Sequence, residues 1–366
     1  MSENKRIVFL DYLRVVACFM VMVVHACECF YFGADGGLHY DSAADAFWAT
    51  WIDSAVRACV PLFVIASSYL LFPVTRPAGE FFRRRLVRVV IPFVIWCALY
   101  VWRFDGKALA CLFNFPMATG GHLWFVPMLV GLYLLMPLVS PWAERATERE
   151  VRGWLILWFA TTLFPYLRRL WGALYGDPSF GAVPYLYGEC PWNMFGAFHY
   201  VSGFFGYVLL GFWFRKFASD MTRKRTISIA APLWLVGAAI IGGGFFFRIP
   251  DRFPFSAPYA FAVDLEMSIE YCSLGVALAT VGAFMVVRKF TASGALYRFV
   301  IAPLSKASYG TYLLHMFVLL AVFEKVRPDC STPVTILVTA SVSFVASSLI
   351  SLAIGSVPKL GRWIVG

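Results

Sequence analysis

Long apolar runs, separated by short polar or glycine- and proline-containing segments, recur along all 366 residues of the chain. A helix that crosses a bilayer needs about 20 predominantly apolar residues, and most of the runs reach this length. The pattern predicts about ten transmembrane helices, at approximately 7–31, 47–74, 86–102, 122–141, 152–167, 199–217, 227–247, 265–287, 303–324 and 333–357. We therefore expect an all-α, polytopic membrane bundle.

The composition agrees with an integral membrane protein. Hydrophobic residues make up 60% of the chain, charged residues only 14%, and the mean hydropathy is +0.72, whereas soluble domains contain about 25% charged residues. No polar segment between the runs is long enough for a separate soluble domain, so residues 1–366 are predicted to form a single integral membrane domain. Asp11 and Arg14 interrupt the first run, which therefore does not resemble a cleaved signal peptide.

The distribution of lysine and arginine predicts the orientation. Most of these residues fall in loops on the same side as the N-terminus, including the cluster Arg83, Arg84, Arg85 and Arg88. The positive-inside rule then places both termini in the cytoplasm. The net charge of +10 mostly reflects this asymmetry and an attraction to anionic lipid headgroups. The lipid bilayer is thus the expected partner, and nucleic-acid binding is not implied.

The nine cysteines are scattered along the sequence and show no CxxC or Cys/His spacing of a metal site. Most of them, such as Cys18 and Cys59, fall inside apolar runs, where we interpret them as small buried hydrophobic residues. Cys111, Cys190 and Cys330 fall in connecting loops, without support for a disulfide. We expect no metal.

The first run carries four ionisable residues on one helix face: Asp11, Arg14, His25 and Glu28. Arg14 and His25 are eleven residues apart, which is within about 20° of three full turns and corresponds to about 16 Å along the axis. Charged residues are costly in lipid, so this face is expected to point inward. Asp11 can pair with Arg14. His25 is either an interhelical hydrogen-bond partner or a general base, and Glu28 either orients His25 or ends the helix at the outer interface.

Further charged residues occur in the second and third runs. Asp53 and Arg57 are spaced i, i+4 and are expected to form a structural ion pair. Arg85 and Arg88 lie one turn apart before the third run, and Arg84 is i, i+4 to Arg88. Topology anchoring accounts for some of these arginines, but guanidinium groups in this arrangement also suit a cytosolic ligand that carries phosphates.

Two runs add candidate residues near the outer surface and the membrane centre. The fourth opens with "GHLWFVPML", which contains His122 and Trp124, and the ninth contains "SYGTYLLH", in which Tyr309, Tyr312 and His315 follow one another at one-turn intervals. Each of these residues alone is more often part of a core than catalytic. We treat them as supporting or acceptor-side candidates.

In combination, these segments resemble the acyltransferase-3 family of integral membrane acyltransferases, which acylate sugars of cell-surface glycans and other extracytoplasmic acceptors. The resemblance covers nearly the whole chain. It rests on the order of "LDYLRVVACFMVMVVH", "VRACVPLFVIASSYLL", "FFRRRLVRVVIPFVIW", "HLWFVPMLVGLYLLMPLV", "YVLLGFW" and "SYGTYLLH". Where many members have a Ser-Gly pair in the second helix, this chain has Ser67 and Ser68.

The resemblance implies that His25 is the catalytic histidine, that Arg14 helps to hold the acyl donor, and that Arg85 and Arg88 contact the phosphates of coenzyme A. It also implies an O-acetyltransferase-like enzyme. We therefore expect transfer of an acyl group, acetyl in the first instance, from cytosolic acetyl-CoA or another acyl-CoA to a hydroxyl of an extracytoplasmic glycan or related acceptor. Modification of a cell-envelope polysaccharide by a protein of the bacterial cytoplasmic membrane is the expected setting.

In the expected mechanism His25, oriented by Glu28, takes the proton from the acceptor hydroxyl as that oxygen attacks the thioester. Tyr309, Tyr312, His122 and Arg57 are candidates for stabilising the oxyanion. A two-step route through an acylated His25 is also compatible with the sequence.

The sequence leaves several alternatives open. A proton- or substrate-coupled transporter or flippase could use His25, Asp11 and the Asp53–Arg57 pair as its path. The choice of acceptor is expected to come from the outer loops at 168–198 and 248–264. Acetyl against succinyl transfer and the oligomeric state, including a homo-oligomer, are not decided by the sequence.

Overall fold

The computed structural model describes residues 6–32, 37–104, 121–176, 201–249, 251–257 and 268–366. The described part is mainly helical and contains one two-stranded sheet. It divides into two compact units. The first consists of Met1–Ala26, Leu71–Arg145 and Phe290–Gly366, and the second of Cys27–Leu70 and Ala146–Lys289. The expected all-α fold is confirmed.

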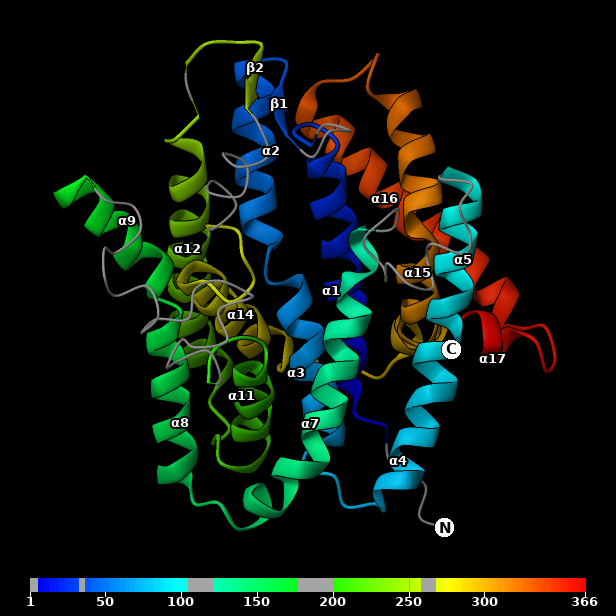
Figure 1. The fold of residues 1–366 in the computed structure, drawn as a ribbon. Coiled ribbons are helices and arrows are strands. Elements are labelled where there is room, and N and C mark those ends of the chain that lie inside the picture. Colours follow the sequence, from blue (N-terminus) through cyan, green and yellow to red (C-terminus); the bar gives the residue numbers. More distant parts are fainter. Residues whose placement is uncertain (1–5, 33–36, 105–120, 177–200, 250, 258–267) are drawn as a thin grey trace. The chain divides into compact units, whose positions relative to one another are not determined.

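The first unit contains most of α1 together with the helices of residues 71–145 and 290–366 (Figure 1). Its elements are α1 (Val8–Glu28), α4 (Ala78–Arg85), the π-helix η1 (Leu86–Val90), α5 (Ile91–Phe104), the 3-10 helix η2 (Gly121–Trp124), α7 (Phe125–Arg145), the π-helix η3 (Tyr297–Ile301), α15 (Ala302–Val326), α16 (Thr332–Gly355) and α17 (Gly361–Ile364).

Small and hydroxyl-bearing residues hold α15 against α16, and the two helices lie side by side (Figure 1). Ser351 Oγ donates to the Ala307 carbonyl at 3.0 Å, and Thr311 Oγ1 donates to Ser348 Oγ at 3.3 Å. Gly310 faces Ser351 so closely that a Cβ there would lie 2.3 Å from the Ser351 hydroxyl. Helix interfaces in membranes are typically built in this way, because lipid tails give no hydrophobic drive for helix association.

The second unit contains the sheet and the remaining helices. Its elements are β1 (Leu38–Tyr40), α2 (Ala43–Val56), α3 (Cys59–Leu71, apart from its last residue), α8 (Glu148–Thr161), α9 (Phe164–Tyr175), α11 (Phe205–Lys216), α12 (Arg223–Phe246), β2 (Phe255–Ala257) and α14 (Leu274–Val287). Strands β1 and β2 are antiparallel, and Leu38 lies opposite Ala257. The hydrophobic pattern did not predict this sheet, since a three-residue strand shows too little alternation to be recognised.

Glycines allow α12 to approach its neighbours closely in the second unit. A Cβ on Gly237 would lie 2.5 Å from the Gly275 carbonyl oxygen of α14, and one on Gly242 would lie 2.5 Å from the Trp51 ring of α2. Trp234 Nε1 also donates to the Ala55 carbonyl at 2.9 Å. Small residues therefore fix the distances between α12 and both neighbouring helices.

Seven helical segments of the described residues are long and apolar enough to cross a membrane. They are Val8–Glu28, Ala43–Leu71, Ala78–Arg103, Gly121–Arg145, Arg223–Phe246, Tyr297–Val326 and Thr332–Gly355. The other three predicted spans correspond to α8, α11 and α14, which have 14, 12 and 14 residues. A polytopic membrane protein is thus confirmed, and within the described residues seven of the ten predicted spans have the required length. The predicted spans 199–217 and 265–287 begin outside the described residues.

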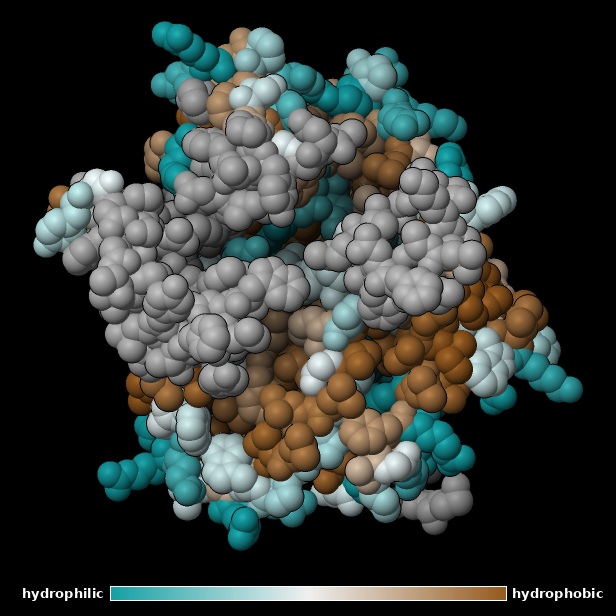
Figure 2. Space-filling view, viewed as in Figure 1, coloured by the Kyte–Doolittle hydropathy of each residue, from teal (hydrophilic) through white to brown (hydrophobic). Residues whose placement is uncertain are grey.

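The surface also agrees with a protein embedded in lipid. Large apolar side chains that a soluble protein would bury are exposed on α5 and α7, among them Trp102, Leu134 and Leu138. In Figure 2, brown apolar side chains cover the surface where Figure 1 places these two helices, and teal charged side chains border them at the lower edge of the view. This face of the first unit fits contact with hydrocarbon chains.

Candidate active site

Three histidines from three different elements meet in the first unit. His25 lies near the C-terminal end of α1, His122 in η2 and His315 in the middle of α15. The ring centroid of His25 is 5.1 Å from that of His315 and 6.1 Å from that of His122, and the rings of His122 and His315 are 5.0 Å apart. His122 and His315 are buried, and His25 is half-buried. The structure therefore brings together three candidates from separate segments.

We call His25, His122 and His315 the histidine cluster. Hydrogen bonds to backbone carbonyls fix its surroundings. The His315 Nδ1 atom lies 2.6 Å from the Tyr312 carbonyl oxygen, so that nitrogen carries the proton and donates. Tyr312 in turn donates its hydroxyl to the His122 carbonyl at 2.5 Å. The Tyr100 ring of α5 packs on His122 with a centroid distance of 4.8 Å. These contacts fix the positions of His122 and His315.

One nitrogen of the cluster, on His122, remains available. His122 Nε2 is buried and has no hydrogen-bond partner among the described residues. An unpartnered buried nitrogen of this kind is costly unless a ligand or water satisfies it. No group of three metal-ligating side chains in the described part of the chain has the arrangement of a metal site. A neutral imidazole has a ring nitrogen that can accept a proton, so the cluster offers a general base.

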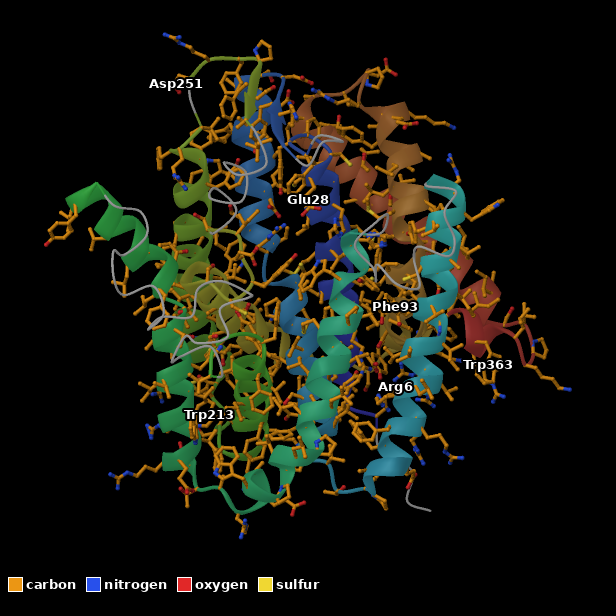
Figure 3. All side chains as sticks on the ribbon, viewed as in Figure 1. Arg6, Glu28, Phe93, Trp213, Asp251 and Trp363 are labelled. Carbon is orange, nitrogen blue, oxygen red and sulfur yellow. The ribbon has the colours of Figure 1, made fainter. Side chains whose placement is uncertain are left out.

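At the other end of α1, Asp11 is the centre of a buried polar network in the first unit. Its carboxylate accepts hydrogen bonds from Ser305 Oγ at 2.6 Å and from the Tyr297 hydroxyl at 2.7 Å. It also pairs with Arg6 at 2.5 Å, just before α1 (Figure 3), and with Arg14 at 3.8 Å. The expected Asp11–Arg14 pair is confirmed, although Arg6 is the closer partner. The Asp11 carboxylate raises the pKa of the Arg6 guanidinium.

Next to this network lies a cavity of about 490 Å³ with a strongly positive lining. Four cationic residues line it, and no acidic side chain does so among the described residues. The lining consists of Arg14, Val87, Arg88, Ser305, Lys306, Ser308, Tyr309, Arg362 and Gly366. Its volume is in the range of ligand sites, about 300–1,000 Å³. We call it the basic cavity; its charge suits a ligand with several phosphate groups.

The three candidate arginines before α5, Arg84, Arg85 and Arg88, have different environments. Arg88 lines the basic cavity. Arg84 pairs with Glu80 at 2.5 Å on the surface, and the Arg85 guanidinium lies over the rings of Phe81 and Tyr133. The π-helix η1 begins directly after Arg85, so the spacing expected for a regular α-helix does not hold across Arg85 and Arg88. Of the three, only Arg88 lines this cavity.

Tyr309 joins the basic cavity to η1. It lines the cavity, and its hydroxyl donates to the Val89 carbonyl at 2.6 Å. Trp124 ends η2, two residues after His122, and is half-buried. Tyr309 and Tyr312 are stacked one turn apart on α15, with ring centroids 6.4 Å apart. One face of α15 thus carries Tyr309 at the basic cavity and Tyr312 and His315 at the histidine cluster.

The remaining two candidates, Glu28 and Arg57, form an ion network in the second unit. Arg57 Nη1 lies 3.2 Å from Glu28 Oε1 and 3.1 Å from Asp53 Oδ1. Arg57 Nε donates to the Ile269 carbonyl at 3.1 Å, and the Tyr31 hydroxyl donates to Asp53 at 3.1 Å. The expected Asp53–Arg57 pair is confirmed. The Glu28 carboxylate is engaged by Arg57, a contact that the sequence did not predict.

Comparison with known families places the chain. A family model for an acyltransferase domain, that of the acyltransferase-3 family, matches residues 7–354, which is nearly the whole chain. The chain belongs to the acyltransferase-3 family. No curated protein and no solved structure matches it. The family assignment, together with the apolar helices, indicates a membrane-embedded acyltransferase and does not favour a transporter.

In this acyltransferase-3 protein, the structure adds residues that the sequence analysis did not single out as ligands. Lys306 and Arg362 line the basic cavity beside Arg14 and Arg88. In the sequence, both are only two of the many basic residues on the same side as the N-terminus. Arg362 reaches the cavity because the short helix α17 packs against α5, where Trp96 Nε1 donates to the Ile364 carbonyl at 2.8 Å. No local pattern indicates such a contact between residues more than 260 positions apart.

Proposed function

We propose that the protein transfers an acetyl group from cytosolic acetyl-CoA to a hydroxyl group of an extracytoplasmic glycan. The observation that carries this proposal is the pair of features on the first unit: a basic cavity at Arg14, and a histidine cluster at His25, eleven residues further along the same helix. Family membership supplies the reaction class, acyl transfer within a membrane protein.

The basic cavity is the proposed site for the phosphates of the donor. Arg14, Arg88, Lys306 and Arg362 provide four positive charges around about 490 Å³. Guanidinium groups bind phosphate oxygens through paired, charge-assisted hydrogen bonds. Asp11 holds Arg14 at 3.8 Å, so this arginine is partly positioned before a ligand arrives. The pantetheine arm would then run along α1, about 16 Å from Arg14 to His25.

The histidine cluster is the proposed site of the chemistry. The imidazole of His25 takes the proton from the acceptor hydroxyl, the hydroxyl oxygen forms a bond to the thioester carbonyl carbon, and the carbon–sulfur bond then breaks. The proton held by His25 passes to the departing thiolate of coenzyme A.

This arrangement requires that the donor enters from the cytoplasm and the acceptor from the other side of the membrane. Both termini and the basic cavity would then face the cytoplasm, in agreement with the positive-inside rule. The proposal includes ten membrane crossings, the number that the sequence pattern predicts.

Two measurements on the full-length protein test the proposal. The first is the thermal stability of the detergent-purified protein with acetyl-CoA, which should rise with ligand concentration because a ligand that binds the native state stabilises it. The second is mass spectrometry of surface glycans from strains that lack or overproduce the protein. Loss of one acetyl mass in the deletion strain, restored by the wild-type gene and not by a His25→Ala gene, is the expected result. Unchanged glycans in all strains would overturn the assignment of a glycan as acceptor. An absent thermal response would overturn the assignment of acetyl-CoA as donor.

A further inference from the structure

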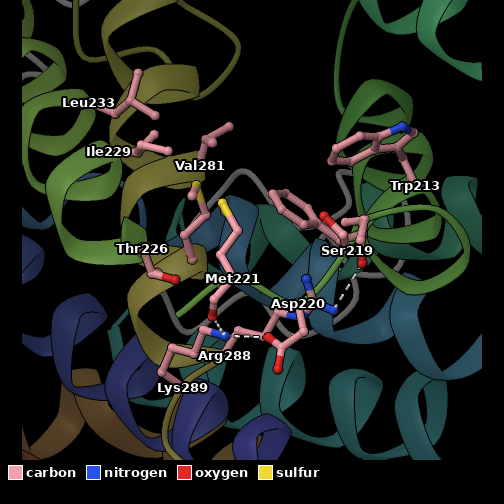
Figure 4. A pocket seen from close by; sticks show the side chains of 13 residues that line it. Trp213, Ser219, Asp220, Met221, Thr226, Ile229, Leu233, Val281, Arg288 and Lys289 are labelled. Atoms are coloured by element: carbon pink, nitrogen blue, oxygen red, sulfur yellow. Dashed lines mark hydrogen bonds and ion pairs between the residues drawn. The ribbon is translucent and has the colours of Figure 1, made fainter. Parts of the chain in front are cut away.

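A second cavity lies in the second unit, among α11, α12 and α14, and has no part in the proposed acyl transfer. Its volume is about 360 Å³, which is again in the range of ligand sites. Most of its wall is apolar, and charged residues gather at one end (Figure 4). The apolar part consists of Trp213, Phe214, Ala218, Met221, Ile229, Leu233, Val281 and Met285, and the polar part of Ser219, Asp220, Thr226, Arg288 and Lys289. We call it the α11–α14 groove.

The polar end contains a side chain whose hydrogen-bonding capacity is unused. Thr226 is 1% exposed, lies in the first turn of α12, and its hydroxyl has no hydrogen-bond partner among the described residues. In Figure 4 this hydroxyl points toward Met221 across the groove. A buried hydroxyl without a partner costs free energy unless a ligand or water satisfies it. The α12 N-terminus adds the partial positive charge of the helix dipole to this end.

The positive charges at the same end are only partly compensated. Lys289 is paired with Asp220 and also donates to the Met221 carbonyl. The ammonium of Lys289 lowers the pKa of the Asp220 carboxyl. Arg288 makes one long hydrogen bond, 3.4 Å, to the Ala218 carbonyl and no ion pair among the described residues. Since a guanidinium has five N–H donors, most of the donors of this half-buried arginine remain available.

From these observations we propose that the α11–α14 groove binds one anionic glycerophospholipid from the surrounding bilayer. The phosphate would accept hydrogen bonds from Arg288 and from Thr226, and one acyl chain would lie along Ile229, Leu233 and Val281. The groove combines the two requirements of such a lipid: a cationic, donor-rich end and an apolar wall leading away from it.

The apolar wall decides between a lipid and a soluble anion. A nucleotide or free phosphate would gain from Arg288 and Thr226 but would leave the wall from Ile229 to Leu233 exposed to water, which is unfavourable. Ile229 is 39% exposed at the edge of the groove, and α12 is one of the seven apolar helices. A lipid can therefore enter sideways from the bilayer. Clusters of lysine and arginine at the ends of membrane helices are typical positions for anionic headgroups.

The test measures lipid binding to the detergent-purified full-length protein by native mass spectrometry. The probes are phosphatidylglycerol, phosphatidylcholine with the same acyl chains, and glycerol 3-phosphate. We expect phosphatidylglycerol to bind more tightly than phosphatidylcholine. Arg288→Gln should weaken phosphatidylglycerol binding about tenfold, the usual effect of losing one charged hydrogen-bond partner. Arg149→Gln removes the same charge from an exposed position on α8, outside the groove, and should have no effect.

Two further variants keep the result interpretable if Arg288→Gln reduces stability. Thr226→Val keeps the shape and removes only the hydroxyl that lacks a partner, so it should fold normally and weaken phosphatidylglycerol binding a few-fold. Val281→Phe should fill the groove and weaken both lipids, whereas Val345→Phe, on an exposed position of α16, should not. Equal binding of the two lipids, wild-type binding by both Arg288→Gln and Thr226→Val, or effective competition by glycerol 3-phosphate would each overturn the proposal. Acetyl transfer is not needed for any of these measurements, so their outcome is independent of the proposed function.

Discussion

Arg362 offers the sharpest test of the basic cavity, because the structure and not the sequence places it there. In Arg362→Gln, the cavity would lose one of its four positive charges, and a shorter polar side chain would remain. Arg362 is exposed, so its attraction to a phosphate is screened by water. Two unit charges 4 Å apart in water interact by about 1 kcal/mol. The dissociation constant for acetyl-CoA should therefore rise roughly fivefold.

Substitution of Arg14 should weaken acetyl-CoA binding more than substitution of Arg362. Its side chain is only 31% exposed and is held by Asp11, so a phosphate bound there is less well screened. Loss of a hydrogen bond to a charged group costs about 1.5–3 kcal/mol. Arg14→Gln should thus weaken acetyl-CoA binding by roughly tenfold to a hundredfold, more than Arg362→Gln. Added salt should reduce the contribution of Arg362 more than that of Arg14, because exposed charges are screened more strongly.

The assay is direct binding of acetyl-CoA to the detergent-purified protein, by calorimetry or by the rise in melting temperature with ligand. Arg84→Gln is the matched control: it removes the same charge nearby, but Arg84 pairs with Glu80 and does not line the cavity. If Arg362→Gln binds acetyl-CoA as tightly as the wild type, the cavity is not the donor site. If Arg84→Gln weakens binding equally, net charge and not the cavity determines affinity.

Three further predictions concern catalysis and stability. His25→Ala should reduce acetyl transfer by about 10²- to 10⁴-fold, the usual contribution of a general base, with no change in melting temperature; transfer at the wild-type rate would remove His25 from the mechanism. Asp11→Ala should lower the free energy of unfolding by roughly 3 kcal/mol, because it leaves two hydroxyls without their charged acceptor. The ion pair with Arg6 adds little to this loss, since the Arg6 side chain is 51% exposed. Denaturant titration measures the change, and an unchanged unfolding midpoint would contradict the prediction. Gly237→Ala should lower the melting temperature because its Cβ would lie 2.5 Å from a backbone oxygen of α14, at a typical overpacking cost of about 1–3 kcal/mol; Gly153→Ala, with nothing within 4 Å, is the control and should melt no earlier than the wild type.

Helical periodicity predicted the parts of the site that depend on one segment. Asp11 and Arg14 pair as expected, Asp53 and Arg57 likewise, and Tyr309, Tyr312 and His315 follow one face of α15. These are relations between residues three or four positions apart, which the geometry of an α-helix fixes before any tertiary contact forms. The polytopic all-α fold could be predicted for a similar reason, since the length of an apolar run alone indicates a membrane helix.

Contacts between distant segments could not be predicted in this way. The partners of Asp11 on η3 and α15, Tyr297 and Ser305, are almost 300 residues away. Glu28 turned out to pair with Arg57, on another segment, although one turn of helix separates it from His25. The break between α2 and α3 at Arg57 and Ala58 also left no signal, because the apolar run continues across it. A hydrophobic pattern records how much surface is buried and not which segment covers it.

The ion network around Arg57 limits which residue can occupy this position. One guanidinium pairs with two carboxylates, Glu28 and Asp53, and donates to the Ile269 carbonyl, while its Cζ atom lies 5.1 Å from the centre of the Tyr271 ring. A lysine would keep the charge, but its single ammonium lacks both the planar fork and the stacking face. Arg57→Lys, nominally the mildest exchange, would therefore release the backbone at Ile269, just before α14. At this position the shape of the cation matters as much as its charge.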